Sequence, residues 1–247
     1  MDNTLYVGLS HQMAMRRHMD VIANNLANMN TTAFKKESVL FRKYLEDGGQ
    51  AGQNMPEEIA FVYDLGISRN YKPGEYTQTG NPLDIALTER GFLEVQADNG
   101  DIFYTRNGHL QIDEDGRLVT QGGEAVLDNE GAEIVFGPND EEITIAGDGT
   151  ISSTQGQIAR ISLVEFAPDQ EQSLRKAGNS LYTTDVEPEP AATARILQGK
   201  IESSNVEPIR QMTKMIETMR AYQSTEQMLQ QYQKLQSDAV RRLAKVQ

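Results

Sequence analysis

Hydrophobic residues recur at helical spacing in the first thirty residues of the chain. On a seven-residue frame, one row holds Leu5, Gln12, Met19 and Leu26, and the row three residues later holds Gly8, Met15, Ile22 and Met29. From Met15 onward both rows are apolar, which is typical of the a and d positions of a coiled coil. The pattern predicts a helix over about residues 5–28.

Four asparagines crowd the predicted end of this helix: Asn24, Asn25, Asn28 and Asn30. Asparagine is unfavourable inside a helix and favourable at caps and turns, because its side chain competes for backbone hydrogen bonds. The helix should therefore stop near residue 28 and lead into a turn over residues 31–34. We expect this asparagine-rich turn to hydrogen-bond across subunits and so to fix their register, as single polar residues do in coiled coils.

The longest periodic segment runs from about residue 206 to residue 246. One heptad row holds Met215, Tyr222, Leu229, Gln236 and Leu243, flanked first by Met212 and Met219 and later by Tyr232, Ala239 and Val246. A sustained 3.5-residue period predicts a left-handed supercoil. Pro208 suits the first turn and Asn205 suits the N-cap. Such a helix is on the order of 60 Å long, more than a small core can cover, so it needs a partner.

We predict that the two helices form an assembly seam. Its residues are Leu5, Met15, Met19, Ile22, Leu26, Met29, Met212, Met215, Met219, Tyr222, Leu229, Tyr232 and Leu243. The polar residues that set the register and the turns are Asn24, Asn25, Asn28, Asn30 and Asn205. A stripe of Met and Leu at helical spacing is usually ordinary core, but the length and the 3.5-residue period favour a seam between helices.

Between the helices the hydrophobic pattern changes to a period of two. Residues 92–96, 110–112 and 143–145 alternate apolar and polar side chains, which is typical of half-buried strands. Frequent turn sequences separate them: Asn99-Gly100, Asn107-Gly108, Asp115-Gly116, Gln121-Gly122-Gly123, Glu130-Gly131 and Asp148-Gly149. Asn-Gly and Asp-Gly supply the positive φ that tight hairpins need. The pattern predicts an antiparallel β domain.

The predicted fold class is α+β, with N- and C-terminal coiled-coil-forming helices flanking a central antiparallel all-β domain. Residues 1–45 form an N-terminal helix and turn that act as an assembly arm, and 206–247 form a long C-terminal assembly helix. Residues 46–79 form a linker or extended region, which includes a flexible connector at 48–54. The β domain covers 80–185, and an extended acidic return linker covers 186–205.

The distribution of charge separates the same segments. Residues 1–45 contain six basic and three acidic residues, 206–247 contain seven and four, and 46–205 contain ten and twenty-nine. The net charge of −13 argues against nucleic acid as a partner, because phosphate binding needs a positive surface. Apolar stretches are shorter than the ~20 residues of a membrane span, and the first residues lack the basic leader of a secretory signal. We therefore expect neither membrane insertion nor a cleavable signal peptide.

Templates for catalytic and metal sites each lack a required residue. The absence of Cys excludes thiolate catalysis and Cys-based zinc sites. His11 and His18 are too far apart for the usual i, i+4 metal pair. The run at 113–116 lacks the further ligands of a calcium loop, and the acidic run at 140–142 has no predicted apolar pocket to raise a pKa. We expect no enzyme, no catalytic residue, no metal and no cofactor.

Several motifs, in order along the chain, resemble those of the bacterial flagellar rod and hook proteins. They are VIANNLANMNTTAFK at 21–35, TGNPLDIAL at 79–87, YTRNG at 104–108, DGT at 148–150, QGKIESSNV at 198–206 and RAY at 220–222. Ala33 stands where this family commonly has glycine. That departure suggests that the backbone at residue 33 does not need a positive φ.

The resemblance implies a structural subunit of the flagellar basal-body rod, the axial drive shaft. Its partners would be the other proteins of the proximal and distal rod, assembled helically, with terminal helices as the inner tube and the β domain outside. Export would use the flagellar type III export apparatus, with an uncleaved N-terminal segment, and the rod would span the periplasm. Within this family, residues 1–8 and the moderate length favour a proximal rod protein. The alternative is a distal rod protein or a hook-type axial subunit.

Two functions of other classes compete with this interpretation. One is a cell-wall carbohydrate-binding β module with helical arms, against which the low aromatic content counts. The other is a hydrolase that uses acidic residues of the centre, for which Asp113, Asp115 and Asp140 are the candidates.

Overall fold

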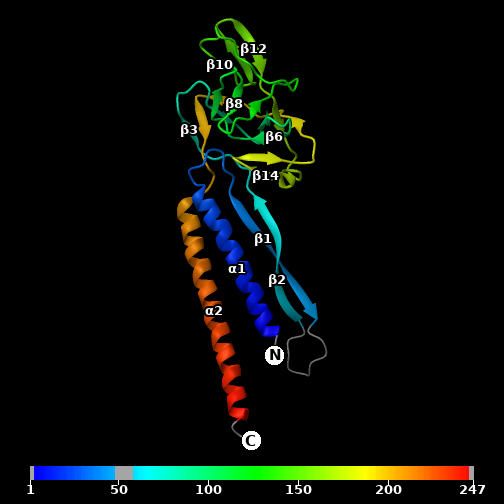
Figure 1. Ribbon diagram of the computed structural model, residues 1–247, viewed down its shortest axis with the longest axis vertical. Coiled ribbons are helices and arrows are strands. Elements are labelled where there is room, and N and C mark those ends of the chain that lie inside the picture. Colours follow the sequence, from blue (N-terminus) through cyan, green and yellow to red (C-terminus); the bar gives the residue numbers. More distant parts are fainter. Residues whose placement is uncertain (1–2, 48–57, 245–247) are drawn as a thin grey trace. The chain divides into compact units, whose positions relative to one another are not determined.

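The computed structural model describes residues 3–47 and 58–244 (Figure 1). They form two compact units. The first contains α1, β1, β2 and α2, and the second contains Asn28–Lys36 and Arg69–Val206. A helix at each end and antiparallel strands between them confirm the predicted α+β class. The connector predicted at residues 48–54 lies outside the described residues.

Two long helices dominate the first unit. α1 (Asn3–Ala27) has 25 residues and α2 (Pro208–Ala244) has 37, and they lie side by side in opposite directions (Figure 1). α1 ends at the asparagine-rich segment, as the sequence predicted. α2 begins at Pro208, where the missing N–H removes no helical hydrogen bond. Within the described residues, neither helix has an apolar stretch long enough to cross a membrane.

Two strands accompany α1 in the first unit, β1 (Glu37–Asp47) and β2 (Glu58–Arg69). They pair as a two-stranded sheet, where the sequence had placed the end of the N-terminal arm and an extended linker. The ring of Phe41 in β1 meets the ring of His18 edge-on, with centroids 6.2 Å apart. β1 contacts α1, and a local hydrophobic period does not reveal such contacts.

The second unit is a set of antiparallel sheets. The largest has nine strands, in the order β14-β15-β6-β5-β9-β8-β7, with β13 paired to β5 and to β16. A three-stranded sheet, β10-β11-β12, and two pairs, β17-β4 and β18-β3, complete the unit. The strands are β3 (Tyr76–Gln78), β4 (Ile85–Leu87), β5 (Phe92–Gln96), β6 (Ile102–Thr105), β7 (Leu110–Ile112), β8 (Leu118–Thr120), β9 (Ala125–Val126), β10 (Thr144–Ile145), β11 (Thr150–Ser153), β12 (Gly156–Arg160), β13 (Leu163–Glu165), β14 (Arg175–Gly178), β15 (Leu181–Thr183), β16 (Glu189–Pro190), β17 (Ile196–Gln198) and β18 (Lys200–Glu202).

The β region extends beyond the predicted range of 80–185 at both ends. β3 precedes that range and pairs with β18, and β17 pairs with β4. Three short strands therefore lie where the sequence predicted a return linker at 186–205. Their residues show no alternation, because each strand is only two or three residues long and takes its hydrogen bonds from a distant strand.

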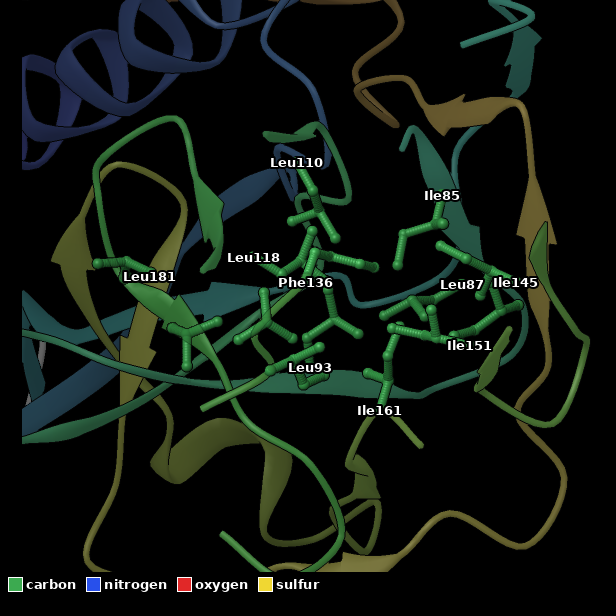
Figure 2. Close-up of a cluster of buried hydrophobic side chains, with 14 residues drawn as sticks. Ile85, Leu87, Leu93, Leu110, Leu118, Phe136, Ile145, Ile151, Ile161 and Leu181 are labelled. Atoms are coloured by element: carbon green, nitrogen blue, oxygen red, sulfur yellow. The ribbon is translucent and has the colours of Figure 1, made fainter. Parts of the chain in front are cut away.

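The core of the second unit consists of two clusters. The larger is mainly aliphatic, includes Phe136, and contains side chains from β4, β5, β8, β10, β11 and β17 (Figure 2). The smaller is aromatic, and its rings meet edge to face, as for Tyr104 and Phe166 with centroids 5.1 Å apart. This modest core agrees with the low hydrophobic fraction of the chain, 38%.

Turn glycines follow the sequence prediction with one exception. Glycines 100, 116, 123, 131 and 149 have positive φ, as tight turns require. Gly108 does not, so the positive φ predicted for Asn107-Gly108 is wrong. A Cβ on Gly108 would lie 1.9 Å from the carbonyl oxygen of Ile85. Glycine is needed there because two backbones approach closely, not because of the turn.

Candidate assembly surface

Close contact between α1 and α2 fixes their register. A Cβ on Gly8 would lie 2.6 Å from Cδ2 of Leu229, so glycine allows the two helices to approach closely at this point. One turn further along α1, Nδ1 of His11 lies 3.5 Å from the hydroxyl of Thr225. Residue numbers rise on one helix as they fall on the other, and the pair is therefore antiparallel.

The predicted seam residues occupy different environments. Ile22 is buried, while Met29, Met212 and Met219 are exposed. The side chain of Leu243 lies outside the described residues. The remaining seam residues are half-buried: Leu5, Met15, Met19, Leu26, Met215, Tyr222, Leu229 and Tyr232. The predicted set is thus divided between the α1–α2 contact and the outer surface of the helices.

A polar row on α2 occupies part of the face that the sequence predicted to be apolar. Thr218 is buried one heptad before Thr225, and Gln211 is buried one heptad before that. Both threonine hydroxyls donate to the carbonyl four residues earlier in the helix, at 2.8 Å for Thr218 and 3.0 Å for Thr225. These internal hydrogen bonds satisfy the hydroxyl protons within α2, so that a threonine can lie at a helix contact.

Each helix also exposes a row of large apolar side chains. We name these rows the α2 stripe, made of Ile209, Met212, Ile216 and Met219, and the α1 stripe, made of Tyr6, Leu9 and Met13. Their spacings of three and four residues place each stripe on one helix face. The heptad rows predicted from the sequence did not include Ile209, Ile216 or the α1 stripe, because they followed adjacent positions of each helix. A second frame, displaced by one residue, would have identified them.

In the second unit, three segments distant in sequence meet at a buried group of charges. The side chains of Lys35, Arg106 and Glu202 are all 0% exposed. Lys35 pairs with one carboxylate oxygen of Glu202, and the other accepts from Arg106 at 2.8 and 3.0 Å. Each residue belongs to a different motif of the flagellar resemblance, so this group explains why those motifs occur together in one chain.

Two cations share the single carboxylate of this group. Burial, and then the positive charge of Arg106, lower the pKa of Lys35 to about 8, although Glu202 opposes the shift. Lys35 also donates to the carbonyl of Lys72 at 2.9 Å, and Glu202 accepts from the backbone N–H of Gly74 at 2.9 Å. A buried charge cluster of this kind holds a fixed arrangement only while every member has its partner.

The turn before Lys35 contradicts one expectation from the sequence. Ala33 has φ of 58°, in the left-handed region, although its identity suggested that no positive φ is needed. Its N–H donates to the backbone carbonyl of Glu202 at 2.8 Å, and its side chain is fully buried. This hydrogen bond and the charge group beside it hold this conformation, which costs about 1–2 kcal/mol for a residue other than glycine.

The asparagines predicted to set register hold local structure within one chain. Asn25 exchanges two hydrogen bonds with the backbone of Glu37, at 2.7 and 2.8 Å, and Asn24 donates to the Glu37 carboxylate at 3.0 Å. Asn28 accepts from the Thr31 hydroxyl at 3.2 Å. Asn30 is exposed. Polar side chains at this helix end therefore organise the chain's exit from α1.

Asn205 does not cap α2 as predicted. Its side-chain oxygen accepts from the backbone N–H of Lys36 at 2.7 Å. Its nitrogen donates to the carbonyls of Asn70 and Lys72, at 2.7 and 2.8 Å. Three segments of the second unit are joined by this one amide, because it offers an acceptor and two donors at once.

The acidic residues considered for hydrolysis stabilise turns. Asp113 pairs with the guanidinium of Arg117 at 2.8 Å. Hydrogen bonds from the Ser153 hydroxyl and the Gly137 N–H lower the pKa of Asp140, which favours the ionised form. Across residues 3–47 and 58–244, no group of three His, Asp or Glu side chains is arranged to hold a metal ion.

A cleft of about 580 Å³ opens beside β13 and is lined by polar side chains that include Glu94, Arg160 and Glu187. Tyr104, its aromatic residue, packs edge-on against Phe166 in the aromatic cluster. Sugar-binding sites use exposed aromatic faces, and this cleft gives the carbohydrate hypothesis no specific support.

Three families of flagellar proteins match successive parts of the chain. The flagella basal body rod protein family matches residues 5–35, the flagellar hook protein FlgE/F/G D1 domain matches 86–153, and the flagellar basal body rod FlgEFG protein C-terminal family matches 197–242. The first and last cover the segments that contain α1 and α2. The second covers the middle of the β region.

Curated relatives match over nearly the whole length. The flagellar basal-body rod protein FlgF of Caulobacter vibrioides is 41% identical, with 100% of each chain covered. FlgF of Mesorhizobium japonicum is 30% identical, with 98% of each chain covered. The flagellar basal-body rod protein FlgG of Buchnera aphidicola subsp. Schizaphis graminum is 31% identical, covering 94% of this chain and 99% of the relative.

Paired terminal helices with exposed apolar rows, together with a β-rich unit, define a class of protein: a structural subunit of an axial assembly. The chain belongs to the flagellar basal-body rod protein family, and its full-length similarity includes FlgF members. The flagellar interpretation of the sequence motifs is therefore confirmed, as is the role of a structural rod subunit of the basal body. The flagellar basal-body rod protein FlgG is related to this chain as well.

Proposed function

We propose that the chain is built into the axial rod through its two terminal helices, which pack against helices of the neighbouring proximal and distal rod proteins. The observation that supports this is the α2 stripe, which α1 leaves uncovered in the free chain. Burying a large apolar side chain stabilises a complex by about 1.5–3 kcal/mol. The predicted seam residues and the stripes together would then be the buried surface of the assembled rod.

The helices would be the least stable part of the free chain. A polar row and a glycine lie at the α1–α2 contact, and most of α2 is exposed, so little apolar burial supports either helix. Packing against neighbouring subunits would supply the missing burial. The circular dichroism of the purified chain should therefore be mainly that of β structure. A fully and stably helical pair of termini in the free chain would contradict coupled folding and assembly.

The proposed function also includes a route of export for the chain and a location in the cell. The family supports secretion through the flagellar type III export apparatus, with residues 1–45 as the signal, and a position across the periplasm. The subunit would act mechanically and have no catalytic activity. A reporter fused to residues 1–45 should be secreted only by cells with a working export apparatus. Retention of that reporter inside such cells would contradict this part of the proposal.

Deleting the gene and isolating basal bodies tests the function directly. Assembly should stop within the rod, and the complete chain supplied from a plasmid should restore it. The variant Leu229→Asp should not restore assembly, because it places a charge at the α1–α2 contact, whereas Ser224→Asp on the exposed face of α2 should. Complete basal bodies in the deletion strain would overturn the proposed function.

A further inference from the structure

The cleft beside β13 is lined by charged side chains of both signs that do not pair with one another. They are the arginines Arg160 and Arg195 and the carboxylates of Glu94 and Glu187. Within the described residues, none of these four side chains takes part in an ion pair. The segment 46–205 contains twenty-nine acidic and only ten basic residues, so arginines without a carboxylate partner are unexpected there. Charges left unpaired at the wall of a cleft are available to a charged ligand.

Both arginines lie at one end of the cleft, beside the turn between β10 and β11. Nε of Arg160 donates to the backbone carbonyl of Asp148 at 3.0 Å. Cδ of Arg195 lies 3.9 Å from the place of a Cβ on Gly147, and its Nη1 donates to a backbone carbonyl at 3.0 Å. The Asp148 carboxylate accepts from the N–H and the hydroxyl of Thr150, at 3.1 and 3.0 Å. The remaining N–H groups of the two guanidiniums can therefore bind the carboxylate of a ligand.

The other end of the cleft combines carboxylates with a phenol. Tyr104 is only 9% exposed, and its ring packs edge-on against Phe166. In the part of the chain that the structure describes, its hydroxyl has no hydrogen-bond partner, although Tyr104 lines the cleft. Glu94 lies directly opposite Tyr104 in the β5–β6 pair. Burial, and then the charges of Glu94 and Glu187, raise the pKa of Tyr104, so its hydroxyl keeps its proton and can donate to a ligand.

The two ends are joined by a short extended segment. Ile161 bridges Asp128 in antiparallel fashion, so the side chains of Arg160 and Ser162 lie on the same face, about 7 Å apart. The Ser162 hydroxyl donates to one carboxylate oxygen of Glu94 and leaves the other free. Alternate side chains of an extended peptide have the same spacing of about 7 Å. Such a peptide can therefore place one side chain at each end of the cleft.

The wall of the cleft is already in place before a ligand arrives. β16 pairs with β13, with Pro190 opposite Val164, and the N–H of Ala191 donates to the carbonyl of Leu163 at 2.9 Å. Pro188 and Pro190 both line the cleft, and proline fixes its own φ. A preformed wall lowers the entropy that is lost when a ligand binds.

We propose that this cleft binds an extended peptide with a basic and an acidic side chain two residues apart. The acidic side chain pairs with Arg160 and Arg195, and the basic side chain pairs with Glu94 and Glu187. The hydroxyl of Tyr104 donates to a carbonyl of the peptide between them. The site belongs to the second unit, and the proposal goes beyond the function of the helices in the rod.

The separation of charge determines which ligands fit. A ligand with charges of only one sign leaves the opposite end of the cleft unpaired, and a neutral sugar pairs with neither end. Two guanidiniums favour a carboxylate, because they can bind both of its oxygens. The volume of about 580 Å³ lies within the range of small-ligand sites, roughly 300–1,000 Å³.

Blocked tripeptides test the proposal. The purified full chain is titrated with acetyl-Lys-Ala-Glu-amide, whose only charges are the two side chains, and binding is measured by calorimetry. Acetyl-Lys-Ala-Gln-amide lacks the acidic group, and acetyl-Gln-Ala-Glu-amide lacks the basic group. Each of these should bind about tenfold more weakly or worse, because each loses a charge-assisted contact at one end of the cleft.

Two variants assign each charge of the peptide to one end of the cleft. Arg195→Gln should reduce the preference for the Lys-Ala-Glu over the Lys-Ala-Gln peptide by about threefold or more, and keep the preference over Gln-Ala-Glu. Glu187→Gln should do the reverse. Both residues are exposed, so the β signal in circular dichroism should be unchanged. Arg175→Gln is the matched control, because Arg175 is exposed, lies outside the cleft and pairs with Asp185. It should bind all three peptides as the unmodified chain does.

Absence of binding by acetyl-Lys-Ala-Glu-amide at millimolar concentration would overturn the proposal, as would equal affinity for the three peptides. Preferences that stay the same in folded Arg195→Gln and Glu187→Gln chains would also overturn it. None of these outcomes bears on the proposed function, which is tested by the assembly of basal bodies.

Discussion

Glu202 balances the buried charges of the second unit. Its carboxylate is the shared acceptor for Lys35 and Arg106, and its backbone carbonyl accepts from the N–H of Ala33. Buried ion pairs add little net stability when complete, but removing one member leaves a charge without its counter-charge. The arrangement therefore makes the joining of three distant segments depend on one side chain.

Replacing Glu202 by glutamine keeps the size of the side chain and removes its charge. The variant Glu202→Gln leaves two buried cations unbalanced, and we expect a loss of about 3–5 kcal/mol in the free energy of unfolding. Urea unfolding of the β signal, followed by circular dichroism, measures this loss. Glu130→Gln at an exposed turn is the matched control and should change stability by less than about 0.5 kcal/mol. Equal effects of the two variants would contradict the role of the charge group.

The lowered pKa of Lys35 predicts a dependence of stability on pH. In the unfolded chain Lys35 keeps its proton up to its ordinary pKa of 10.5, whereas in the folded chain it loses the proton near pH 8. The unfolded state thus binds more protons between these values, and stability contributed by this group rises with pH across that window. Lys35→Met should remove this rise. Parallel pH profiles for the two chains, measured below the tyrosine pKa of about 10, would contradict it.

Sequence reasoning at the residue scale identified the relevant asparagines but not their partners. Asn25 and Asn205 bind backbone groups 12 or more residues away, and residue type alone does not reveal such partners. Ala33 and Gly108 show the same limit. Ala33 has a positive φ because its backbone bonds to Glu202. Gly108 does not have a positive φ, and glycine is needed there because the backbone of Ile85 lies close to it.

At the scale of elements, the sequence predicted both helices and the alternating strands, because each has a local period. It did not predict which face of α2 meets α1, because Thr218 and Thr225 are polar and hydrophobic spacing selects against them. It also missed β1 and β2 and the short strands β16 to β18. The strands β16 to β18 obtain their hydrogen bonds from distant segments, and no local pattern records that pairing, while β1 and β2 pair with each other.

Gly8 tests the contact between the helices. The variant Gly8→Leu would place a branched side chain where even a Cβ lies 2.6 Å from Leu229. We expect the small helical part of the circular dichroism signal of the free chain to melt at a lower temperature than in the unmodified chain, with the β signal unchanged. Gly8→Ala should have a small effect, since the tip of Leu229 can move and alanine favours a helix by about 1 kcal/mol. Similar melting of both variants and the unmodified chain would contradict the close approach.

At the scale of the whole molecule, each unit has a distinct composition. The segments that contain α1 and α2 are basic and rich in methionine, while the centre is strongly acidic. Methionine adapts its shape to different neighbours, which would suit the proposed packing of these helices against other rod proteins. The second unit has its own buried core and charge group, separate from the helices of the first unit.

Protection of α2 on assembly tests the central claim most directly. A single cysteine at Met219, in the otherwise cysteine-free chain, is labelled with a maleimide in the purified protein and in isolated basal bodies. Met219 is 52% exposed in the free chain, so Met219→Cys should react readily there and be protected in basal bodies. Glu130→Cys, at an exposed turn of the second unit, reports the reactivity of an unburied site. Equal labelling of Met219→Cys in both preparations would contradict burial of the helices in the rod.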